Sequence, residues 1–189
     1  MTEIATQATV RSSAAAQSRA EADNALIVAA LALKTEMAEC YQELAEQMEH
    51  CNNCEAAETF RQLVERQHQH LKTLSELEPN SQPSATPAWI QNGGFETPTT
   101  DLFANAHYLM CPHQVVKMAL DIERQNQQRL DNRLETQPPP QSLLYQHPLR
   151  LSYQQQHSLH LQHLEQLLNT LPAPAPHWDD DPDPPNIDD

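Results

Sequence analysis

The sequence predicts an all-α protein with four antiparallel helices. The chain contains only two glycines, Gly93 and Gly94, which argues against a β-rich fold with many tight turns. All 15 prolines lie at or after position 79, so the long N-terminal apolar pattern contains no helix-breaking residue. Four segments carry apolar residues at helical spacing, and prolines or polar turns separate them. These observations together predict helices and no sheet.

The helices are expected over about residues 22–49, 55–77, 112–135 and 149–171. The Asn52–Asn53 pair predicts a tight turn between the first two, and Pro79 ends the second. Pro112 suits the first position of the third helix, which the prolines at 138–140 end. Residues 79–111 form a long crossover between the second and third helices. A structureless loop of this length is unusual, so we expect it to pack along the helices or to contain a short helix.

The composition divides the chain into three parts: a flexible N-terminus (1–21), a helical domain (22–171) and a C-terminal tail rich in Pro and Asp (172–189). The net charge is −15. An acidic chain without a basic patch is a poor candidate for binding nucleic acid or an anionic membrane surface. No secretion signal and no apolar stretch of membrane-spanning length is present, so a cytoplasmic location is expected.

Each predicted helix places one or two polar residues among its inward-facing apolar ones. Burying such groups is costly unless they pair with one another or bind an ion. Two of the pairs have the i, i+3 spacing by which two-metal helical bundles direct ligands inward. The six candidates are Lys34, Gln67, His70, Glu123, His157 and His160.

Helical phase separates this set from a more obvious motif. Glu65-x-x-His68 has the Glu-x-x-His spacing of a two-metal ligand pair. Glu65, however, lies about 140° from the centre of the apolar face of its helix. We therefore predict that Glu65 is a solvated surface residue.

Four segments resemble the rubrerythrin-like branch of the ferritin-like superfamily. They are ALALKTEMAECYQELAEQME (30–49), FRQLVERQHQHL (60–71), AHYLMCPHQVVKMALDIE (106–123) and HSLHLQHLEQLL (157–168). The resemblance implies a ferritin-like antiparallel four-helix bundle with the long crossover between its second and third helices. It also implies two irons held by four carboxylates and two histidines, oxidase or peroxidase chemistry, and a homodimer.

The ligand set departs from this family pattern. His70, Glu123 and His160 match it, whereas Lys34, Gln67 and His157 stand where the family has glutamates. One remaining carboxylate cannot neutralise two divalent cations, and Lys34 adds a positive charge, so the centre is degenerate.

Two interpretations follow. In the first, His70, Glu123, His157 and His160 bind one transition metal, with Fe or Zn preferred, and Lys34 and Gln67 support these ligands. The protein would then be a metal-binding relative with a residual oxidoreductase role. In the second, Lys34 pairs with Glu123, no metal binds, and the protein is a structural or dimerisation module. Whether the protein is an enzyme stays open at this point.

The cysteines and remaining aromatic residues have ordinary structural explanations. Cys51-x-x-Cys54 has redox or zinc spacing, but it falls at a helix–helix turn without a second cysteine pair. Cys40 is expected in the core, and Tyr41 and Tyr153 are expected on inward faces.

Overall fold

The computed structural model describes residues 28, 30–77, 98–136 and 148–179. Within these ranges every regular element is a helix, which confirms the all-α prediction. None of the described helices is long and apolar enough to cross a membrane. The elements are helix 30–50, α2 (Cys54–Leu77), α4 (Pro98–Asn105), α5 (Pro112–Thr136) and α6 (Pro148–Thr170).

The helix boundaries agree closely with those expected from proline and turn positions. Pro112 and Pro148 are the first residues of α5 and α6, where their missing N–H groups cost nothing. The short helix α4 lies within the predicted crossover. The expected flexible N-terminus, the expected helix start at residue 22, Gly93–Gly94 and the tail beyond residue 179 lie outside the described residues.

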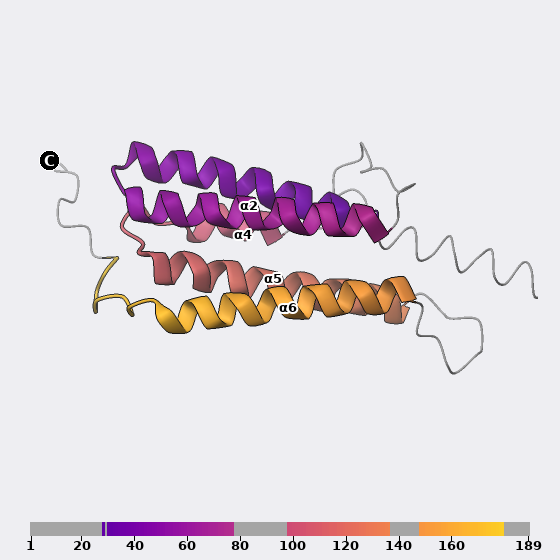
Figure 1. The fold of residues 1–189 in the computed structure, drawn as a ribbon. Coiled ribbons are helices and arrows are strands. Elements are labelled where there is room, and N and C mark those ends of the chain that lie inside the picture. The colour runs from indigo at the N-terminus through magenta and orange to yellow at the C-terminus, as the bar shows by residue number, and fades with distance from the viewer. Residues whose placement is uncertain (1–27, 29, 78–97, 137–147, 180–189) are drawn as a thin grey trace, which may run out of the picture.

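The long helices lie side by side in two pairs, helix 30–50 with α2 and α5 with α6 (Figure 1). Helix α5 contacts α2, α4 and α6, and α6 also contacts α2. Side chains from all of these helices therefore meet in a shared interior.

The turn between helix 30–50 and α2 is fixed by two consecutive asparagines. Asn52 has a positive φ of 59°, which suits a residue that ends a helix in the left-handed conformation. The N–H of Asn52 donates to the carbonyl of Glu49 at 3.0 Å, and that of Asn53 donates to Met48 at 2.9 Å. Asn53 then caps α2, since its Oδ1 accepts the N–H of Ala56 at 3.2 Å. The predicted turn is confirmed, with a separate role for each asparagine.

Asn53 also joins this turn to the start of α5. Its Nδ2 donates to the carbonyls of Tyr108 at 2.9 Å and Met110 at 2.8 Å. The N–H of Cys111 donates to Oε1 of Gln114 at 2.6 Å, which is one half of a capping box at the N-terminus of α5. One asparagine thus ties the beginnings of two helices together.

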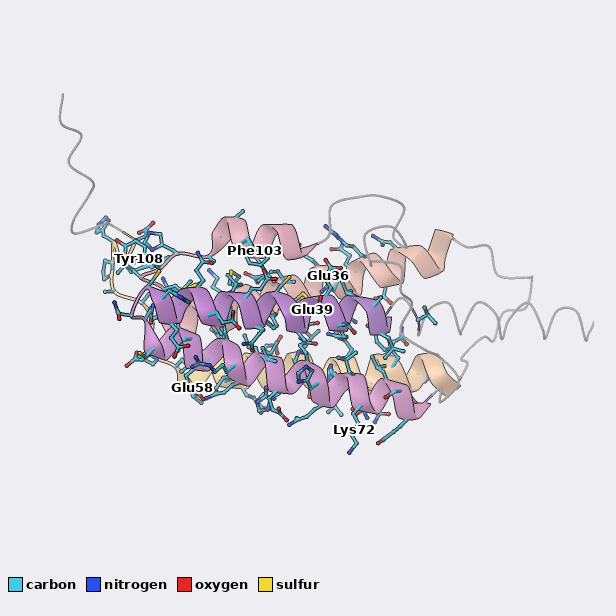
Figure 2. All side chains as sticks on the ribbon, turned by 90° about the horizontal axis from the view of Figure 1, so that it is seen from above. Glu36, Glu39, Glu58, Lys72, Phe103 and Tyr108 are labelled. Atoms are coloured by element: carbon cyan, nitrogen blue, oxygen red, sulfur yellow. The ribbon has the colours of Figure 1, made fainter. Side chains whose placement is uncertain are left out.

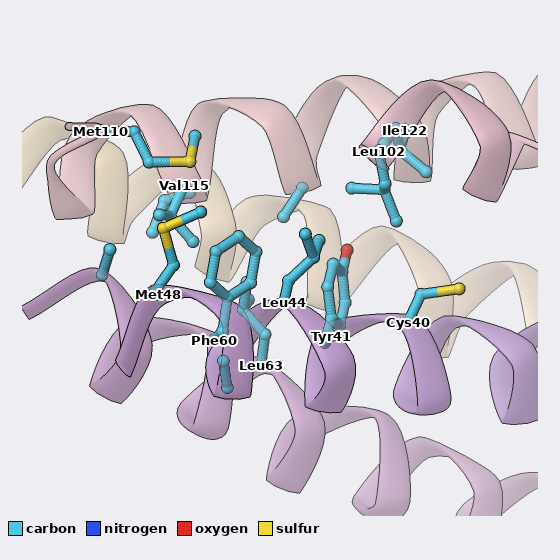
Figure 3. Packing of buried hydrophobic residues seen from close by; sticks show 14 of the residues in the cluster. Cys40, Tyr41, Leu44, Met48, Phe60, Leu63, Leu102, Met110, Val115 and Ile122 are labelled. Atoms are coloured by element: carbon cyan, nitrogen blue, oxygen red, sulfur yellow. The ribbon is translucent and has the colours of Figure 1, made fainter. Parts of the chain in front are cut away.

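The larger apolar core contains residues from every described helix (Figure 3). Tyr41 packs beside Phe60, with ring centroids 6.1 Å apart. Cys40 is in this core, as predicted. A smaller cluster consists of Ala30, Leu31, Leu74 and Tyr153. Val64, Leu168 and Leu171 are half-buried against the larger core, and Leu71 is half-buried against the smaller cluster.

The six candidate polar residues lie between these two apolar clusters. Along helix 30–50, Lys34 separates Leu31 of the smaller cluster from Met37 of the larger. Along α6, His157 and His160 lie between Tyr153 and Leu164 in the same way. The interior therefore contains a polar layer with apolar packing on both sides.

Candidate functional site

The structure brings all six sequence-predicted site residues into one group, which we call the polar cluster. Five of its members are exposed by 5% or less: Lys34 1%, Gln67 1%, Glu123 0%, His157 2% and His160 5%. His70 is half-buried, as its position on the flank of the apolar stripe predicts. The residues come from helix 30–50, α2, α5 and α6, so the group exists only because these four helices pack together.

The centre of the polar cluster is the Glu123 carboxylate. Nζ of Lys34 donates to its Oε2 at 2.5 Å, and Nε2 of Gln67 donates to its Oε1 at 2.6 Å. The ion pair is sealed from solvent, with side-chain exposures of 2% for Lys34 and 0% for Glu123. Both carboxylate oxygens therefore already have strong protein donors, and one positive charge balances the negative one.

The ammonium of Lys34 decides the ionisation of Glu123. Burial on its own would raise the pKa of this carboxyl group. The adjacent Lys34, followed by His160, outweighs that effect and holds the pKa of Glu123 well below its ordinary value. Glu123 is thus an anion at neutral pH, and it depends on Lys34 for compensation.

The histidines lie around this ion pair but form no normal hydrogen bond with the Glu123 carboxylate. Nε2 of His160 lies 3.5 Å from Oε1 of Glu123, and Nδ1 of His157 lies 3.9 Å from Oε2. Both distances exceed those of normal N–H···O hydrogen bonds. The ring of His160 lies 4.3 Å from that of His70 and 6.4 Å from that of His157, measured between centroids. Both ring nitrogens of His157 and the Nε2 of His160 are buried without a hydrogen-bond partner.

Two of the imidazoles are held neutral. Burial, and then the electrostatic influence of the neighbouring His160 and Lys34, lower the pKa of His70 to about 3. Burial and then Lys34 lower the pKa of His157 to about 4. A second buried cation beside Lys34 is unfavourable, so His70 and His157 add no positive charge to the Lys34–Glu123 pair.

A two-metal centre does not fit these residues. Glu123 is the only carboxylate in the polar cluster, and Lys34 stands against it where a cation would bind. Across the described ranges, no three His, Cys, Asp or Glu side chains converge closely enough to hold a metal ion. The donor atoms of the cluster suit one transition-metal ion better than two, because imidazole nitrogens without hydrogen-bond partners are good ligands for such an ion.

Sequence reasoning missed one buried polar residue of this layer. Asn126 is 1% exposed and lies three residues after Glu123 in α5, so it shares the same helix face. Both polar atoms of its side chain lack a hydrogen-bond partner. The i, i+3 spacing that identified the other pairs would have found it.

A small cavity opens beside the histidines. Its volume is about 10 Å³, enough for the centre of a single water molecule. It is lined by His70, Thr73, Leu74, Tyr153, Gln156 and His157. The Tyr153 ring stacks on His157, with 5.9 Å between centroids and 13° between planes, so this inward-facing tyrosine positions a histidine of the cluster.

The alternative motifs lie away from the polar cluster. Glu65 and His68 are both exposed, which confirms the phase argument. Cys51 and Cys54 are exposed and are not joined by a disulfide. His107 stacks on Tyr108 and meets the edge of Trp178, and His113 is half-buried near the start of α5.

Comparisons of this chain with protein-family models, with curated proteins and with solved structures found no match.

Proposed function

We propose that this protein is a ferritin-like four-helix bundle in which an internal ion pair replaces the two-metal centre. It functions without metal, as a structural or dimerisation module. The observation that carries the proposal is the double engagement of Glu123 by Lys34 and Gln67. The resemblance to rubrerythrin-like sequences supplies the fold family and the comparison with a two-iron centre.

The charge balance of the buried layer also supports this proposal. Carboxylates in a two-metal centre bridge the ions and neutralise them. Here a fixed ammonium neutralises the one carboxylate, so the buried layer is balanced without any ion. A divalent ion added to this layer would meet the Lys34 charge and no uncompensated carboxylate, which is a costly arrangement in a low-dielectric interior.

Reversion of the altered positions tests this proposal. The triple variant Lys34→Glu, Gln67→Glu, His157→Glu restores the carboxylates that the resemblance places at these positions. We expect it to take up two iron ions per chain, whereas the unmodified protein takes up none under the same conditions. The matched control carries three exposed substitutions to glutamate, Gln42→Glu, Gln62→Glu and Gln128→Glu, which add acidic residues without reaching the interior. Failure of the triple variant to bind two irons would refute the proposed origin of the site.

A second candidate function is the binding of one transition metal, Fe or Zn, by His70, His157 and His160 near Glu123. The unpartnered nitrogens of His157 and His160 favour it, since buried polar atoms without partners are unusual in folded proteins. Calorimetric titration of the untagged protein with Zn²⁺ distinguishes the metal-free function from the single-metal function. Saturation at one ion per chain, lost in His160→Ala and kept in the exposed His68→Ala, would favour the single-metal function.

A further inference from the structure

An open groove lies on the outer surface between helix 30–50 and α2, and we call it the helix-pair groove. Its volume is about 400 Å³, within the range of sites that hold small ligands or anchoring side chains. The residues that line it include three apolar ones, Ala38, Val64 and Leu71, and three exposed polar ones, Glu39, Glu43 and His68. The groove therefore combines an apolar floor with polar margins on both helices.

The floor of the helix-pair groove is the edge of the protein core. Ala38 is buried, with 4% of its surface exposed. Val64 packs against the larger apolar cluster, and Leu71 packs against the smaller one. None of the six polar-cluster residues lines the groove. The groove is thus an apolar surface held rigid by the core, and it is separate from the Lys34–Glu123 ion pair.

The margin of the groove on helix 30–50 is acidic. Glu39 and Glu43 are four residues apart, so their carboxylates lie on the same side of the helix. Within the described part of the chain, neither of them has an ion-pair partner. Lys34 is the only Lys or Arg between residues 30 and 50, and it is buried in the polar cluster. On α2 the exposed Lys72 is close in sequence but does not line the groove. Two carboxylates therefore stand beside the apolar floor, and no cation of their own helix compensates them.

Charge and shape together suit a basic, amphipathic helix as the occupant. The net charge of −15 attracts cationic partners and repels a second copy of the chain. Along helix 30–50 the groove runs from Thr35 to Glu43, about 12 Å, which is close to two turns of a helix. A helix that binds in such a groove places apolar residues at i, i+3 or i+4, and i+7 on the floor. Lys or Arg residues beside these anchors would lie within reach of Glu39 and Glu43.

We propose that the helix-pair groove binds a basic amphipathic helix of a partner protein. The apolar side of that helix packs on Ala38, Val64 and Leu71, and its Lys or Arg residues pair with Glu39 and Glu43. The inference goes beyond the metal-free function, because no residue of the polar cluster takes part. A contact two turns long is far smaller than a standard interface, so the dissociation constant for one such helix is on the order of 100 μM.

Fluorescence anisotropy of a labelled peptide, titrated with the full chain, tests this inference. The probe is an amidated peptide of about 18 residues made of Ala, Leu and Lys, with leucines on one helical face and lysines beside them. We expect the unmodified protein to bind it. Two control peptides have glutamate in place of lysine or serine in place of leucine. Each should bind at least about tenfold more weakly, because one lacks the charge complementarity and the other the apolar anchors.

Matched protein variants locate the binding surface. Glu39→Gln/Glu43→Gln should raise the dissociation constant of the lysine peptide about fivefold or more, because two ion pairs are lost. Glu58→Gln/Glu76→Gln removes the same charge from exposed positions of α2 that do not line the groove, and should leave binding nearly unchanged at physiological salt. Figure 2 shows helix 30–50 and α2 side by side, with Glu39 on the first and Glu58 on the outer side of the second. All four positions are exposed, so both variants should fold, and circular dichroism checks this.

Charge reversal provides the converse test. Glu39→Lys/Glu43→Lys should bind the glutamate peptide more tightly than the unmodified protein does, and the lysine peptide more weakly. Two results would overturn the inference. One is no binding of the lysine peptide at protein concentrations up to about 1 mM. The other is an equal loss in the groove variant and its α2 control, which would mean that the peptide is attracted only by the net charge. Iron and zinc analysis of the same samples tests the metal-free function independently, so failure of peptide binding leaves that result intact.

Discussion

The Nζ of Lys34 lies 2.5 Å from Oε2 of Glu123, and packing on all sides seals the two side chains from water. The two residues are 89 positions apart in the sequence, on helix 30–50 and α5. Their ion pair lies in the polar layer between the two apolar clusters. The cluster members Gln67, His70, His157 and His160 are arranged around it, so the chemistry of the interior depends on this one contact.

Removing Lys34 should be strongly destabilising. Lys34→Met leaves Glu123 buried without its cation, and breaking a buried pair in this way costs about 3–5 kcal/mol. Urea unfolding followed by circular dichroism measures the change in the free energy of unfolding.

Two comparisons establish that the loss comes from the buried charge. In Lys34→Met/Glu123→Gln the uncompensated carboxylate is absent, and much of the lost stability should return. Arg124→Ala breaks the exposed contact to Glu165, 2.7 Å long, and should cost at most about 1 kcal/mol. A Lys34→Met protein as stable as the unmodified one would show that the ion pair is not the main electrostatic contact of the interior.

Acid should destabilise the protein from about pH 6.5 downward. In the unfolded chain a histidine titrates near 6.5, whereas the folded pKa is about 4 for His157 and about 3 for His70. Between these values the unfolded state binds more protons, so stability falls as the pH falls. Each histidine contributes up to about 1.4 kcal/mol per pH unit within its window. The lowered pKa of Glu123 adds a further loss below 4.5.

Unfolding measured between pH 7.5 and 5 tests this dependence. His157→Gln should make the slope of stability against pH shallower by about one proton, whereas His50→Gln, at an exposed position, should leave it unchanged. Equal slopes in all three proteins would mean that His157 is not held neutral by the fold.

The Asn52–Asn53 turn offers a matched pair of opposite substitutions. Asn53→Ala removes the cap of α2 and both bonds to the carbonyls of Tyr108 and Met110, and should cost about 2 kcal/mol or more. Asn52→Gly suits the positive φ of 59° and should be neutral or slightly stabilising. Thermal unfolding of the two variants measures both effects. A similar loss in both would indicate that the turn tolerates no change, rather than that Asn53 has a special role.

Much of this arrangement follows from local sequence rules. Pro112 and Pro148 mark the helix starts because proline fits the first turn of a helix and interrupts its interior. Helical phase identified the polar cluster, because a residue on the apolar stripe of a packed helix is directed into the interior. Helical phase also excluded Glu65 from the interior, and Glu65 is exposed.

What the sequence did not predict depends on contacts between distant residues. Phase placed Lys34 in the stripe, but only helix packing determines whether its ammonium reaches Glu123 or extends past it. Asn53 was expected to form a turn, yet its link to the start of α5 depends on how α2 and α5 meet. The stacking of Tyr153 on His157 is likewise a matter of side-chain placement within the packed interior.

We have proposed that the Lys34–Glu123 ion pair takes the place of bound metal. The most direct measurement is the metal content of the untagged, full-length protein, expressed in iron- and zinc-supplemented medium and analysed by mass spectrometry of the elements. We predict metal far below one ion per chain, and a melting temperature that a chelator does not change. One or two ions per chain that survive purification would contradict it.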